Sequence, residues 1–325
     1  MTERENAIEI LKFGSPERIV PGLPTYTITY HGCNHEGYLG GGHDCSVGEK
    51  WTDIWGTEWH KEHPGVMGFP RGNPLADISC LKNYEWPDPD DPRICGKIYQ
   101  MAELYQPGDT FLTGQHRDTL WEKSYMLIGM ENMMQYLYTE PEYAREILHR
   151  IMDFQLGIAK HYINLGVEMI SAGDDLGTQC APLLNPNIIR EVFMPEYKRL
   201  FDLYKSHNVI INFHSCGNVD RLLDIFIDLG ISVLNPVQAT ANDLDKLRSQ
   251  TQGKIALMGG ISTTILMDGP VEAIVSEVKS RMCQLGKYGG YICAPDQDMP
   301  FPQKNIDAFR EAVDRYGAYP IIEPM

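Results

Sequence analysis

The second half of the chain alternates short apolar runs with segments of helical periodicity, and this alternation limits the fold more than any other feature of the sequence. Strands are predicted at residues 167–172, 209–213, 232–236, 255–258 and 291–293, and helices at 187–206, 219–229, 241–249, 271–285 and 304–316. Strict alternation of strand and helix is typical of a parallel sheet with right-handed crossover connections. An open doubly wound sheet and a closed (β/α)8 barrel both satisfy this pattern.

The first half of the chain decides between these two architectures by its strand count. Further strands are predicted at 26–30, 53–56 and 110–113, followed by a helical region at 120–165 that breaks near Pro141. These three strands and the five later ones give the eight strands of a (β/α)8 TIM barrel. Residues 32–92 are rich in Gly, Pro, His and Trp, and we expect them to form a long insertion over the mouth of the barrel. No linker interrupts the chain, so a single domain over 1–325 is predicted.

The charge of the chain excludes several kinds of partner. With 28 Lys and Arg against 44 Asp and Glu, the net charge is −16, which disfavours nucleic acids and anionic membrane surfaces. No segment offers about 18 uninterrupted apolar residues, and the first residues do not resemble a cleavable leader. We therefore expect a cytoplasmic protein. The eight cysteines are too sparse for a disulfide scaffold and remain available as thiolate ligands.

The sharpest chemical motif is His214-Ser215-Cys216-Gly217-Asn218, which directly follows a predicted strand. Barrel enzymes carry their active sites at the carboxyl ends of the strands, and two residues separated by one point to the same side of an extended chain. His214 and Cys216 are therefore candidates to bind one metal ion. Cys293, near the end of the last predicted strand, is the candidate third ligand, and such a His/Cys/Cys set leaves one tetrahedral position open on a zinc ion. The alternative is a buried histidine beside inert thiols.

A second polar motif, Asp174-Asp175, also follows a predicted strand. One carboxylate could orient a substrate, move a proton or support a metal ligand; the alternative is a turn or a helix cap. Gln238 follows the next strand but one and could line the same pocket, or could be an ordinary polar loop residue. Segment 31–45 holds three histidines and two cysteines in a spacing that matches no common zinc pattern, and we expect these residues to belong to a lid.

Taken together, these motifs resemble the uroporphyrinogen decarboxylase superfamily, and within it the branch of corrinoid-dependent methyltransferases of the methylcobamide methyltransferase kind. The resemblance covers almost the whole chain. It implies a (β/α)8 barrel with a deep cleft at the carboxyl ends of the strands, and a zinc ion on an H-x-C motif and a distant cysteine, here His214, Cys216 and Cys293. The segments that carry it are 53–56, 74–75, 121–131, 173–186, 195–198, 214–218, 289–295 and 305–317.

Two departures from the family pattern qualify these expectations. True decarboxylases carry an M-R-Q-A-G-R-Y segment whose arginines bind porphyrin carboxylates, whereas residues 26–32 here contain no arginine. Porphyrinogen decarboxylation is therefore not expected, and Tyr30 and His31 in this segment are assigned to a different substrate. Some methyltransferases place the last cysteine in a P-G-C-like turn, which corresponds here to Pro295-Asp296-Gln297. Either Cys293 or Gln297 then completes the metal site.

The resemblance thus implies a zinc-dependent methyltransferase that moves a methyl group between a small molecule and the corrinoid of a partner protein. The small molecule would be a thiol or a methylated oxygen, sulfur or nitrogen compound. Zinc would lie on the histidine and cysteines, Asp174 or Asp175 would orient the substrate or relay a proton, and Asn218 and Gln238 would line the pocket. The alternatives are a metal-independent decarboxylase or lyase on the same barrel, and a non-catalytic protein that binds a small ligand or a corrinoid.

Overall fold

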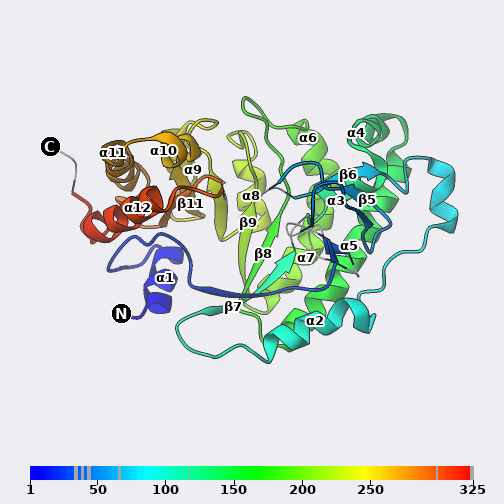
Figure 1. The fold of residues 1–325 in the computed structure, drawn as a ribbon, viewed down its shortest axis with the longest axis horizontal. Helices are drawn as coiled ribbons and strands as arrows, with labels where there is room; N and C mark the ends of the chain where they lie inside the picture. The colour runs from blue at the N-terminus through cyan, green and yellow to red at the C-terminus, as the bar shows by residue number, and fades with distance from the viewer. Residues whose placement is uncertain are drawn as a thin grey trace.

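The computed structural model describes residues 1–32, 36–37, 40–41, 45–64, 67–116, 118–297 and 299–322. Within them, seven parallel strands form one curled sheet in the order β1-β7-β8-β9-β10-β11-β12, with helices packed along its outer face (Figure 1). The α/β, TIM-barrel-like architecture is therefore confirmed. The strands of this sheet are β1 (Thr25–Ile28), β7 (Phe111–His116), β8 (Met169–Gly173), β9 (Ile210–His214), β10 (Val233–Val237), β11 (Ala256–Ile261) and β12 (Tyr291–Pro295).

The helices that cover the sheet follow the predicted order, with differences at their ends. Gly129, with φ of +94°, separates two helices where one was expected, and the helix expected from 219 begins four residues later. Among the described residues, no helix is both long and apolar enough to cross a membrane. The helices are α1 (Glu3–Leu11), α2 (Pro92–Ala102), α3 (Trp121–Ile128), α4 (Met130–Thr139), α5 (Pro141–Asn164), α6 (Pro186–Ile188), α7 (Met194–Ser206), α8 (Leu223–Leu229), α9 (Leu244–Thr251), α10 (Thr263–Asp268), α11 (Val271–Arg281) and α12 (Gln303–Tyr316), with π-helical turns η2 (Ile189–Phe193) and η3 (Met282–Gly286).

The prediction of an eighth strand at 53–56 is wrong. Asp53 Oδ1 accepts hydrogen bonds from the backbone N–H groups of Trp55 and Thr57, both at 2.9 Å, and Gly56 has a φ of +76°. A carboxylate that binds N–H groups a few residues ahead favours a turn over sheet pairing. The extended segment before β1 instead borders the last strand, where the Cys293 N–H donates to the Val20 carbonyl at 3.0 Å.

Alternate residues of each strand point into the curled sheet. Those near the amino ends of the strands are apolar, and those near the carboxyl ends are polar. Helix α1 packs Ala7 and Ile10 against the amino ends of five strands, through Phe111, Met169, Val233, Ala256 and Ile292. Nearer the carboxyl ends, Asn235 Nδ2 donates to Asn212 Oδ1 at 2.5 Å, and His214 lies two residues beyond Asn212 on the same strand. The polar end is therefore the one suited to a ligand.

The insertion between β1 and β7 packs against helices α3 and α5. Its described elements are β2 (Glu36–Gly37) with β3 (Gly40–Gly41), an antiparallel sheet of β4 (Lys50–Thr52), β5 (Glu58–His60) and β6 (Phe69–Gly72), and the 3-10 helix η1 (Ile78–Asn83). The Leu75 N–H donates to the Leu127 carbonyl of α3 at 2.9 Å, and the Trp55 ring lies edge-on to Phe154 of α5 at 4.7 Å. Of the candidate lid residues, Cys33, His35 and His43 lie outside the described residues.

His116, the last residue of β7, lies on the helix side of the sheet and is fully buried. Its Nδ1 is 2.7 Å from Gln155 Oε1 on α5, and its Nε2 is 2.5 Å from the Tyr204 hydroxyl on α7. Since the amide oxygen only accepts, Nδ1 carries the proton and Nε2 accepts from Tyr204. Burial lowers the pKa of His116 from 6.5 to about 4, although the Gln155 hydrogen bond opposes this shift.

This buried imidazole predicts an acid-sensitive free energy of unfolding. Below pH 6.5 the unfolded chain takes up a proton on His116 that the folded chain refuses until about pH 4. Folding should therefore lose roughly 3 kcal/mol from this one group across that interval, with no loss above pH 7. Urea unfolding of the natural chain and of His116→Asn at pH 7.5, 6 and 5 measures it. The stability of the variant relative to the natural chain should rise as the pH falls; parallel curves would contradict the prediction.

Candidate metal and active site

Three donor groups converge where β8 and β9 end side by side. One ligand atom each from Asp175, His214 and Cys216 lie within 4.8 Å of one another. His214 Nε2 is 3.3 Å from both the Cys216 Sγ and the Asp175 Oδ1. The register of the sheet creates this proximity, because Gly173 pairs with His214 and the two following loops leave the strands together. The structure thus brings together two of the predicted metal ligands and one of the predicted carboxylates.

Two glycines lock these loops against each other. Gly217 has a φ of +83°, and a Cβ there would collide with the backbone of Gly177. The Gly177 N–H donates to the Cys216 carbonyl at 3.2 Å, and the Asn218 N–H donates to the Thr178 carbonyl at 2.6 Å. Only glycine combines a left-handed backbone with so close an approach of two chains. The loop pair therefore fixes the position of Cys216 relative to Asp175.

Further hydrogen bonds orient the three donors. His214 Nδ1 donates to Asn235 Oδ1 at 3.2 Å, so Nε2 is the ring nitrogen that faces the cluster. The Cys216 N–H donates to Asp175 Oδ1 at 3.0 Å, and Gln297 Nε2 donates to the Cys216 Sγ at 3.2 Å. The cluster, defined as Asp175, His214 and Cys216, is thus supported from the ends of β8, β10 and β12.

The electrostatics of the cluster favour a cation. Burial would raise the pKa of Asp175, but the hydrogen bond and charge of His214 outweigh it and lower this pKa to about 2. Burial, reinforced by the Asp175 charge, raises the pKa of the Cys216 thiol to about 12. A thiolate beside this carboxylate would therefore need a positive charge among the three donor atoms. His214 and Asp175 keep 32% and 45% of their side-chain surface exposed, so the cluster is accessible to a small molecule.

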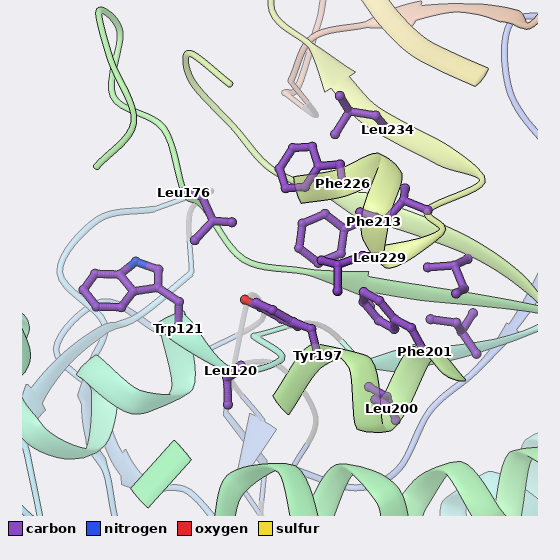
Figure 2. Packing of buried hydrophobic residues seen from close by; sticks show 14 of the residues in the cluster. Leu120, Trp121, Leu176, Tyr197, Leu200, Phe201, Phe213, Phe226, Leu229 and Leu234 are labelled. Atoms are coloured by element: carbon purple, nitrogen blue, oxygen red, sulfur yellow. The ribbon is translucent and has the colours of Figure 1, made fainter. Parts of the chain in front are cut away.

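The two adjacent aspartates have different surroundings. Asp174 is the helix cap that the sequence allowed as an alternative to a functional carboxylate. Asp174 is fully buried and accepts hydrogen bonds from the Leu120 N–H at 2.9 Å and the Glu122 N–H at 2.8 Å, so it caps the start of α3. The Tyr197 hydroxyl also donates to it, at 2.5 Å. Figure 2 shows Tyr197 with its oxygen directed away from the packed rings of Phe201 and Phe213. Burial raises the pKa of Asp174 to about 7, despite these hydrogen bonds.

Cys293 is not brought into the cluster. Its neighbour Ile292 faces the interior with Ile10, so Cys293 faces the helix layer, where the charges of Glu277 and Arg281 on α11 act on it. The thiol is fully buried, which raises its pKa to about 12. From this part of the chain it is Gln297, the alternative third ligand, that reaches Cys216.

Two of the four expected substrate residues, Gln238 and Asn218, contact the loop that carries Cys216, and the other two have different surroundings. Gln238 accepts a hydrogen bond from the Gly217 N–H, and Asn218 Nδ2 donates to the Ala241 carbonyl at 2.6 Å. Both therefore hold the turn that carries Cys216. Tyr30 is buried against Phe154, with ring centroids 5.4 Å apart, and the His31 N–H donates to the Ile94 carbonyl at 2.9 Å.

One residue of this site was missed in the sequence. Asn212 holds Asn235, which in turn orients His214. The available signal was its spacing, because a residue two positions before His214 on a strand shares its inward face.

Comparison with known proteins gives the family of this chain and supports its fold. The model of the family described as uroporphyrinogen decarboxylase (URO-D) matches residues 73–316. The methylated-thiol–coenzyme M methyltransferase of Methanosarcina mazei is 22% identical over 273 residues, which cover 78% of this chain and 66% of that relative. A solved methyltransferase structure from Methanosarcina mazei, 16% identical, superposes with a TM-score of 0.68 over 97% of this chain and 99% of that one, and it supports the fold. The family match covers most of the chain, and the protein therefore belongs to the uroporphyrinogen decarboxylase family.

Proposed function

We propose that this protein is a zinc-dependent methyltransferase of the cytoplasm, which moves a methyl group between a small molecule and the corrinoid of a partner protein. The small molecule would be a thiol or a methylated oxygen, sulfur or nitrogen compound. The observation that carries the proposal is the convergence of Asp175, His214 and Cys216 at the carboxyl end of the sheet. The methyltransferase names of the relatives support the same reaction class.

The donor set fits zinc. A carboxylate, an imidazole and a thiolate are all zinc ligands, and three protein ligands leave the open position that a catalytic site needs. The orientation of His214 is compatible with this set. Because Nδ1 is held by Asn235, Nε2 is the ring nitrogen that faces the carboxylate oxygen of Asp175 at 3.3 Å, and a zinc ion would take the place of the proton between them. We therefore assign Asp175, His214 and Cys216 as the ligands, in place of a set that includes Cys293.

When bound, zinc would lower the pKa of a substrate thiol or polarise the atom that carries the methyl group, and the corrinoid would donate or accept that group. The residues of the chain position the reactants. Asn235 keeps His214 in the tautomer that presents Nε2 to the cluster. Gln297, through its amide hydrogen bond to the Cys216 Sγ, would reduce the charge density on this sulfur and so keep the ion more electrophilic. The exposed sides of His214 and Asp175 would admit the substrate.

The test combines metal analysis with a methyl-transfer assay. Protein purified without added metal should contain about one zinc per chain, and should transfer methyl groups between methylcobalamin and small thiols, or from methyl ethers to reduced cobalamin. A chelator should abolish the transfer and zinc should restore it. A folded protein that takes up no zinc overturns the proposal and favours the metal-independent decarboxylase or lyase. Zinc without methyl exchange, even with corrinoid protein present, favours a binding protein.

A further inference from the structure

Lys123, in the first turn of α3, is a buried cation that contacts no oxygen atom of the described residues. It is 1% exposed. Among the described residues, its Nζ makes one polar contact, with the Met126 sulfur at 3.8 Å, and lies 5.5 Å from the ring centre of Trp55. A thioether is a weak acceptor. The ammonium group is therefore nearly bare of the oxygen atoms that normally surround it.

Such a group is expensive to bury. Removing an ammonium ion from water costs more free energy than a single cation–π contact returns. Buried charges in folded proteins are accordingly paired or bound to ligands. The cost of burying the Lys123 ammonium group without an oxygen partner indicates that its partner is a group outside the described part of the chain.

A second buried donor lies beside the ammonium group. The Trp55 Nε1 meets no hydrogen-bond acceptor in the described part of the chain, although Trp55 is 1% exposed. Trp55 belongs to the insertion and lies edge-on to Phe154, while its ring faces Lys123. An indole N–H usually finds an acceptor when it is buried. Each of these two neighbouring groups therefore lacks an acceptor, and a single anion bound between them would satisfy both.

This pair of donors is connected to the cluster through α3. Asp174, the neighbour of Asp175, caps the first turn of this helix through the Leu120 and Glu122 N–H groups. Lys123 is the next residue along the helix, so the donor pair and the cluster flank the same helix start.

We propose that Lys123 and Trp55 bind an oxyanion, a carboxylate, sulfonate or phosphate, carried by the small molecule that reacts at the cluster. The ammonium group supplies the charge and the indole N–H supplies direction. That the ligand is the methyl donor or acceptor rests on the proposed function; that this pair binds an oxyanion does not. The chain as a whole has a net charge of −16 and repels anions, so we expect anions to bind at this site rather than elsewhere on the surface.

Thermal unfolding of the full chain with defined anions tests the proposal. The probes are sodium benzoate, sodium ethanesulfonate and inorganic phosphate, each compared with sodium chloride at equal ionic strength. At least one probe should raise the Tm of the natural chain by about 2–4 °C, and the probe that does so identifies the oxyanion. Lys123→Met should abolish this rise, and Trp55→Phe, which keeps the ring but not the N–H, should reduce it. Lys160→Met, on the exposed face of α5, is the matched control and should keep it.

In chloride alone, Lys123→Met should unfold at the same or a higher temperature than the natural chain, because it removes an uncompensated charge. A lowered Tm for Lys123→Met, together with no response of the natural chain to any probe, would show that Lys123 is structural and would overturn the proposal. If Lys123→Met does not fold, an undiminished anion response of Trp55→Phe overturns it. Zinc binding and methyl transfer without an anion response would refute only this inference, whereas an anion response without zinc would refute only the proposed function.

Discussion

Replacing Cys216 with serine or His214 with alanine is expected to weaken zinc binding by at least about 100-fold and to remove methyl transfer with it. Each change deletes one of three converging donors, and deletion of a supporting partner alone costs 10- to 100-fold. The chain should still fold, because both side chains lie at the partly exposed end of the sheet. Zinc content by mass spectrometry, with folding followed by circular dichroism, measures the effect.

Two cysteine variants serve as controls for this result. Cys180→Ser changes an exposed thiol and should leave zinc and activity intact. Cys293→Ser decides between the two possible completions of the site, because its thiol faces the helix layer. We expect it to retain zinc. Loss of zinc in folded Cys293→Ser, or retention of zinc in folded Cys216→Ser, would contradict the assignment of ligands.

The adjacent aspartates should respond in opposite ways to the same substitution. Asp174→Ala leaves two backbone N–H groups and the Tyr197 hydroxyl without an acceptor in a buried region. At about 1–3 kcal/mol for each buried donor, the free energy of unfolding should fall by about 3 kcal/mol or more. Asp175→Ala alters a partly exposed carboxylate, so we expect a change in stability of less than about 1 kcal/mol and a large loss of zinc affinity.

Urea unfolding and zinc titration of both variants separate these effects. The pair is its own control, since the two substitutions are chemically identical and neighbouring in sequence. An unchanged unfolding midpoint for Asp174→Ala would show that Asp174 is not the cap of α3 in solution. Unchanged zinc affinity in Asp175→Ala would remove this carboxylate from the ligand set and return Gln297 to consideration.

The seven strands of the sheet could be predicted, out of eight expected, because each is a short run of apolar residues bounded by turn residues, a signal that local sequence carries. The exception, 53–56, contains two apolar residues, but the Asp53 side chain binds the following N–H groups and produces a turn. The apolar residues of this segment favour a strand, but the hydrogen bonds of the Asp53 side chain stabilise a turn instead.

The pairing of His214 with Cys216 could be predicted in the same way, because residues two apart at a strand end point to one side. The direction of the Cys293 side chain could not be predicted. Either Ile292 or its neighbour Cys293 can face the interior of the sheet, and the packing of β12 against α1 decides which. In the structure Ile292 packs against Ile10 and so faces inward. A shift of one residue in this phase would have placed the thiol inside.

The sequence by itself determined the order of strands and helices, the end of the sheet that carries polar residues, and the motif that supplies two of the proposed metal ligands. These properties depend on residues close together in the chain. Only the tertiary structure decided that Asp175 rather than Asp174 joins the cluster, that Gln297 rather than Cys293 reaches Cys216, and that Lys123 is buried beneath Trp55. Each of these outcomes depends on strand phase, loop contact or burial between distant segments, which local periodicity does not encode.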